Sequence, residues 1–164
     1  MGERAAVRDE VLRLVEQARS LTPSTRPADL PPTAVIKNVP AWHNHEHAIW
    51  ELGEQARQRL AEQPRLRADV ELYRTFLPLI ADRAAGRGRQ SWVTLFEFTG
   101  CAPFANEVAA LLSDPDVEGH AVEALTKMNA SGHAAEVVPL LDSRQAWIRK
   151  SARRYVSRFS PDER

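Results

Sequence analysis

The sequence has few of the residues that mark a secreted, fibrous or membrane protein. One cysteine, Cys101, in 164 residues excludes an internal disulfide and favours a reducing compartment. Glycine is scarce, at 7 residues, and no apolar run approaches the ~20 residues that a membrane span needs. The first residues lead into a charged amphipathic segment with no apolar core. We therefore expect no signal peptide, no membrane partner and a cytoplasmic location.

The chain also lacks net charge. Its 22 Lys+Arg balance 22 Asp+Glu, which argues against wholesale electrostatic binding to nucleic acid or to an anionic membrane. The balance hides an uneven distribution. Residues 92–140 hold one lysine and seven acidic residues, whereas residues 141–164 hold seven Lys+Arg and three acidic residues. Unless these segments neutralise each other, a specific charged interface remains compatible with zero net charge.

Strand patterns are nearly absent, and apolar residues recur at steps of three and four. The pattern predicts an all-α protein. Arginine outnumbers lysine 19 to 3, which is typical of a GC-rich, bacterial genome. The expected helices span residues 3–21, 45–63, 66–84, 89–99, 103–113, 116–129, 133–141 and 145–159, with Pro78 kinking or splitting the third.

Prolines are concentrated between the first two expected helices, in residues 22–41. Proline fixes φ and removes a backbone donor, so this stretch is expected to be an extended strap that lies against the body. Residues 1–64 are then an N-terminal region of helix, strap and second helix, which either caps the remainder or forms a separate partner-binding arm. Residues 65–164 are expected to form a domain of stacked helical hairpins.

The last four expected helices form two copies of one hairpin. Val108 and Leu112 correspond to Val137 and Leu141, which lie 29 residues later. The second helices repeat an apolar–Ala–aliphatic pattern at four-residue steps, in Val117, Ala121 and Leu125 and again in Ile148, Ala152 and Val156. A lone hairpin cannot bury its apolar face, so such units stack.

Residues 103–159 resemble the HEAT-repeat family in its short form of about thirty residues. The resemblance rests on the run from Leu111 to Val117, on Leu140-Leu141-Asp142, and on Ile148-Arg149. Glu118 departs from the pattern, because the family has arginine there. The resemblance implies a right-handed α-solenoid-like stack, HEAT-like or armadillo-like, whose second helices line a binding surface. It does not imply an enzyme, and fold alone never fixes function.

The last helix carries the best candidate for a partner-binding surface. With Ile148, Ala152 and Val156 inward, a tryptophan and several cations point outward. An exposed tryptophan among arginines suits an acidic protein or a nucleic-acid backbone. The alternative is a solvated basic helix in which the tryptophan packs against a neighbour. The candidate residues are Trp147, Lys150, Arg153, Arg154 and Arg158.

A histidine cluster at the start of the second expected helix is the candidate metal site. His43, Glu46 and His47 fit H-x-x-E-H, the zinc pattern of inverzincin peptidases, and His45 lies between them. Histidines at i and i+4 share a helix face, and the glutamate of this pattern acts as a general base. The competing interpretation is a capped helix start with solvated histidines. No Gly-rich phosphate loop or activated nucleophile is recognisable, so no cofactor is expected.

These observations favour a non-enzymatic protein-binding module, of the adaptor, regulator or toxin-neutralising type. The first alternative is a nucleic-acid-binding protein that uses its basic C-terminal helix, as the HEAT-like alkylpurine DNA glycosylases use basic and aromatic residues. The second is a metal-binding protein or metalloenzyme that uses His43, His45 and His47.

Overall fold

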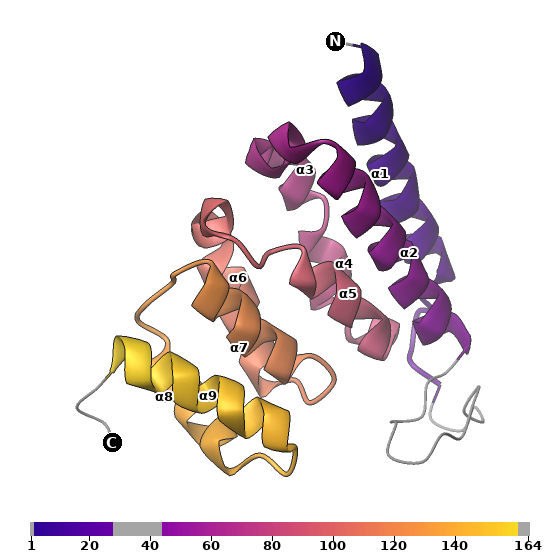
Figure 1. Cartoon of the computed structure of the whole chain (residues 1–164). Coiled ribbons are helices and arrows are strands. Elements are labelled where there is room, and N and C mark those ends of the chain that lie inside the picture. The colour runs from indigo at the N-terminus through magenta and orange to yellow at the C-terminus, as the bar shows by residue number, and fades with distance from the viewer. Residues whose placement is uncertain (1, 28–43, 161–164) are drawn as a thin grey trace. The chain divides into compact units, whose positions relative to one another are not determined.

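Helices form the regular secondary structure of residues 2–27 and 44–160, the parts of the chain that the computed structural model describes (Figure 1). These residues contain no strand, so the all-α prediction is confirmed for them. The chain divides into two compact units, residues 1–92 and 93–164. This division lies between Trp92 and Val93 within one helix, whereas the sequence prediction set its boundary after residue 64.

Two long antiparallel helices dominate the first unit. α1 (Gly2–Leu21) and α2 (Asn44–Glu62) lie side by side (Figure 1), at nearly the positions that apolar periodicity predicts. Of the strap predicted at residues 22–41, residues 22–27 are described and are not helical; the rest lies outside the described residues. The buried side chains of the helix pair are Val11, Leu14, Val15, Ala18, Ile49, Ala56 and Leu60.

The helix expected at residues 66–84, kinked or split at Pro78, is divided into several short segments, and one break falls at residues 75–76, just before Pro78. Asp69 accepts a hydrogen bond from the backbone N–H of Leu72 at 2.9 Å and so starts a new helix at Val70. Pro78 lies in the first turn of the next one, where its missing N–H costs no hydrogen bond. The segments are η1 (Pro64–Ala68), α3 (Val70–Arg74), α4 (Leu77–Ala81) and η2 (Arg83–Arg89).

The helix expected at residues 89–99 is shorter, since α5 covers Gln90–Thr94. Its Trp92 is fully buried, and the indole N–H donates a hydrogen bond to the carbonyl of Ile49 at 3.0 Å. The ring of Trp92 also packs against Phe76, with centroids 5.6 Å apart. The aromatic residue therefore ties the short segments of the first unit to α2.

The second unit contains the two hairpins that the sequence repeat predicts. Their second helices, α7 (Glu118–Lys127) and α9 (Ala146–Phe159), pack against each other, and α8 contacts η4 (Figure 1). The repeated apolar positions are buried, except that Leu140 takes the inward place predicted for Leu141. The remaining elements are η3 (Thr99–Phe104), α6 (Ala105–Ala109), η4 (Ala110–Ser113), α8 (Ala134–Val137) and η5 (Val138–Asp142).

Candidate partner-binding face of the second unit

Buried residues fix which side of α9 faces solvent. Ile148, Ala152 and Val156 are buried as predicted, and Tyr155 joins them with no exposed surface. The Tyr155 hydroxyl donates to the carbonyl of Ala130 at 2.7 Å and accepts from the backbone N–H of His133 at 3.1 Å. These two bonds fix the rotation of α9 about its axis, so all five candidate residues are directed to the exposed side.

Trp147, in the first turn of α9, packs its ring on α7 while staying partly exposed. The residue is 43 % exposed, its indole packs edge-to-face on His120 with centroids 5.2 Å apart, and the indole N–H donates to Gln145 Oε1 at 2.9 Å. A Cβ built on Gly119 would lie 2.2 Å from the ring, so glycine is what lets the indole approach α7. Burial lowers the pKa of His120 to about 4, so this imidazole is neutral at pH 7.

The Glu123 carboxylate of α7 binds two polar side chains of α9. It accepts a short hydrogen bond from the Ser151 hydroxyl and pairs with Arg154 Nη1 at 3.7 Å. Lys127 Nζ lies 4.0 Å from the same carboxylate and also pairs with Glu97. The acidic and basic segments noted in the sequence therefore do neutralise each other in part, across the α7–α9 contact.

Arg158 is bound to the C-terminal end of α7. Its guanidinium donates to Asn129 Oδ1 at 2.7 Å and to the carbonyl of Thr126 at 3.4 Å. Carbonyls at the end of a helix lack intrahelical partners, and a cation there also suits the helix dipole. Arg158 is thus partly engaged in holding the two helices together.

Lys150 and Arg153 are exposed and have no ion-pair partner among the described residues. The five predicted residues therefore differ in their roles. Arg154 and Arg158 are paired within the unit, Trp147 is half-packed, and two cations face solvent. Sequence analysis missed Gly119, His120 and Glu123, because their partners lie 25 or more residues further along the chain.

Asp142 and Arg149, two residues on which the resemblance to HEAT repeats rests, lie at the turn of the second hairpin and at the start of α9. Arg149, which matches the family's arginine, donates to the carbonyls of Ser143 at 2.7 Å and Arg144 at 3.1 Å. Asp142, which matches the turn aspartate, is exposed. The arginine therefore braces the turn of its own hairpin.

The histidine cluster is only partly described, since His43 lies outside the described residues. His45 Nε2 lies 3.2 Å from the carbonyl of Ala84, whereas His47 is exposed, stacks on Trp50 and lies 3.8 Å from Glu51. Among the residues that the structure describes, no three His, Cys, Asp or Glu side chains come together as metal ligands would. Metal binding by this cluster remains a prediction.

Glu46 of the same cluster is a buried structural carboxylate. With no exposed surface, it accepts hydrogen bonds from Arg26 Nη2 at 2.5 Å and from the backbone N–H of Arg87 at 2.9 Å. Gly86 lies against it with φ +53°, and a Cβ there would be 1.5 Å from the carboxylate oxygen. Glu46 therefore joins the segment after α1, the start of α2 and η2.

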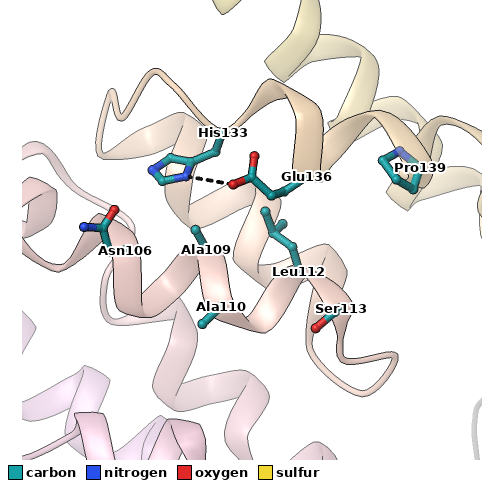
Figure 2. Close-up of a pocket in the computed structure, with 8 residues that line it drawn as sticks. All are labelled: Asn106, Ala109, Ala110, Leu112, Ser113, His133, Glu136 and Pro139. Carbon is teal, nitrogen blue, oxygen red and sulfur yellow. Dashed lines mark ion pairs between the residues drawn. The ribbon is translucent and has the colours of Figure 1, made fainter.

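A groove lies between the first helices of the two hairpins in the second unit. Its volume is about 550 Å³, within the range of ligand sites. Figure 2 shows His133 and Glu136 of the second hairpin facing the wall formed by Asn106, Ala109 and Leu112. His133 Nδ1 lies 3.9 Å from Glu136 Oε1. Sequence analysis missed this groove, because it is formed by residues of both hairpins.

Comparison with known proteins shows no matching family, no similar curated protein and no similar solved structure. Within residues 2–27 and 44–160, no helix is both long enough and apolar enough to cross a membrane.

Proposed function

We propose that this protein is a non-enzymatic protein-binding module that presents the exposed side of α9 to an acidic protein partner. One observation carries the proposal: the exposed edge of Trp147 lies on the same helix as Lys150 and Arg153, two solvent-facing cations without an ion-pair partner among the described residues. Aromatic anchors next to cations are the side chains on which interface energy concentrates. The HEAT-like interpretation is part of this proposal and is supported by the packing of α7 on α9.

The pairing of Arg154 and Arg158 favours a protein partner over a nucleic acid. A protein that grips a duplex neutralises about 6–10 phosphates with its cations. Here Glu123 and the carbonyl end of α7 engage two of the arginines, which leaves Lys150 and Arg153 as the exposed cations of α9 without an ion-pair partner in the part of the chain that the structure describes. Two cations around one aromatic side chain suit a small acidic protein surface.

Photo-crosslinking tests the proposal. A photoreactive residue at position 157, an exposed position of α9 that leaves Lys150 and Arg153 in place, should crosslink an acidic protein in a lysate of the source organism. The double variant Lys150→Glu/Arg153→Glu should reduce capture about tenfold or more, because charge reversal on the rim slows association and shortens residence. Capture should also weaken as salt is raised.

Arg67→Glu is the matched control, because Arg67 is an exposed arginine of the first unit. This control should leave capture unchanged. Equal capture by wild type and the double variant would contradict the proposal. Retardation of duplex DNA at micromolar protein, lost in the double variant, would instead support the nucleic-acid alternative.

A further inference from the structure

The first helices of the two hairpins carry charge of one sign. From residue 98 to residue 126 and from residue 128 to residue 143 the sequence contains no lysine or arginine. The wall elements α6, η4, α8 and η5 carry Glu107, Glu136 and Asp142, all exposed. Glu136 stands at the groove, and its neighbour there is His133. The groove is therefore an apolar surface with an acidic rim.

α9 has the complementary composition. It contains five Lys+Arg and no acidic residue, and it exposes an aromatic edge beside Lys150. Residues three apart on a helix lie on neighbouring positions of one face, so Trp147 and Lys150 project together. An indole needs an apolar surface, and an ammonium needs a carboxylate next to it. Both are present in the groove, where Ala110 and Pro139 lie near Glu136.

We infer that the groove of one copy receives the exposed side of α9 from a second copy. Trp147 would lie on the apolar wall, and Lys150 would pair with Glu136. The copy's own Trp147 does not reach its own groove, because it is packed on Gly119 and His120 of α7, while the groove is lined by α6, η4, α8 and η5. The contact is head-to-tail: at each contact one copy supplies α9 and the other supplies its groove.

This inference rests on the proposed function, since it names a second copy as a partner of α9. The contact contains one indole, one ion pair and one groove. We therefore expect it to bury less than about 1,200 Å² of accessible surface, at the small end of interface sizes. We therefore expect weak association, with a dissociation constant of the order of 100 µM. With the protein at about 1 µM, well below this dissociation constant, copies stay apart in the crosslinking experiment, so the two results are separable.

Sedimentation velocity of the full chain tests the inference. Between about 10 and about 500 µM in low salt, the weight-average mass of the wild type should rise above that of the monomer, and high salt should reverse the rise. Glu136→Lys and Lys150→Glu alter exposed side chains, so both variants should fold. Each alone should remain monomeric, because like charges then face each other at the contact.

An equimolar mixture of the two variants should associate again, because every contact between them pairs a lysine with a glutamate. Arg67→Glu should behave as wild type. A wild type that stays monomeric at about 500 µM in low salt would overturn the inference. So would association that Glu136→Lys leaves unchanged, or a mixture that stays monomeric.

Discussion

At the scale of single residues, the buried carboxylate of Glu46 holds three segments of the first unit together. Glu46 has no exposed surface and is compensated by Arg26 and by the N–H of Arg87. A hydrogen bond to a charged group is worth about 1.5–3 kcal/mol, and a buried group that loses its partner pays the cost of desolvation. The motif that suggested a catalytic base in the sequence thus contains a structural carboxylate.

Glu46→Gln should destabilise the protein by about 1–3 kcal/mol, because the amide keeps the volume but loses the charge that Arg26 requires. The free energy of unfolding in urea, followed by circular dichroism, measures this. Glu71→Gln, at a glutamate that is exposed on α3, is the control and should change stability by less than about 0.5 kcal/mol. Equal stability of both variants would show that the Glu46 charge is not needed.

His120 makes stability depend on pH in a predictable direction. Burial lowers its pKa from 6.5 in the unfolded chain to about 4 in the folded one, so the unfolded state binds the proton more tightly. The stability that this group contributes is fully present above pH 6.5 and is lost as pH falls towards 4. The loss should be of the order of 3 kcal/mol.

His120→Gln should remove this part of the pH dependence between pH 6.5 and 4, as measured by urea unfolding at each pH. The His120 imidazole should titrate near pH 4 when its C–H resonances are followed by NMR. His47, which is exposed, offers the matched variant His47→Gln, which should keep the loss of stability that His120 causes between pH 6.5 and 4. A His120 titration near 6.5 would contradict the burial argument.

At the scale of elements, sequence periodicity predicts the long helices well and the short ones poorly. The ends of α1, α2 and α9 lie within one residue of prediction, because long amphipathic patterns leave little ambiguity. The short segments between Pro64 and Thr94 depend on local caps such as Asp69 and on packing around Trp92. A hydrophobic pattern contains neither of these, so the sequence predicts a helix over residues 66–84 that is interrupted only at Pro78, where the structure has several short segments.

The same limit applies to the candidate site. Helical geometry shows that Lys150, Arg153, Arg154 and Arg158 point outward, and this is confirmed. It does not show that Arg154 pairs with Glu123, because the register between α7 and α9 depends on how the hairpins pack. The groove in Figure 2 was unpredictable for the same reason.

The close approach of α9 to α7 depends on the glycine at position 119, which has no side chain. Gly119→Ala places a Cβ 2.2 Å from the Trp147 ring and 2.8 Å from Ile148 Cγ1, so these side chains, or α9 with them, must shift. Overpacking of this kind costs about 1–3 kcal/mol, which outweighs the ~1 kcal/mol by which alanine favours a helix. Urea unfolding should show the loss, and tryptophan fluorescence should change because Trp147 is displaced.

Gly2→Ala is the control for this prediction, since a Cβ at Gly2 meets no atom within 4 Å. In the double variant Gly119→Ala/Trp147→Ala, the two costs should be less than additive, because removing the indole relieves the clash. Additive costs would mean that Gly119 acts through something other than Trp147.

At the scale of the whole molecule, each unit has its own buried core. Ile49 is fully buried in the first unit and Leu125 in the second. Truncating such a side chain to alanine typically costs about 2–5 kcal/mol. Ile49→Ala and Leu125→Ala therefore each weaken one core, and together they test whether the two units unfold separately.

Hydrogen exchange read by mass spectrometry distinguishes the outcomes. Ile49→Ala should lower amide protection in residues 2–27 and 44–92, and Leu125→Ala should lower it in residues 93–160. In each variant the other unit should keep the protection it has in wild type. A uniform loss across both units would show that the chain unfolds as one cooperative body.

The contact between Arg26 and Glu46 has a consequence for engineering. The two side chains meet at 2.5 Å although 20 positions separate them in the sequence. The entropy of bringing two residues of a chain together grows only with the logarithm of their separation, at about 0.6 kcal/mol for each doubling. Lengthening the sequence between Arg26 and Glu46 should therefore add little to the entropic cost of this contact, as long as the carboxylate stays in place.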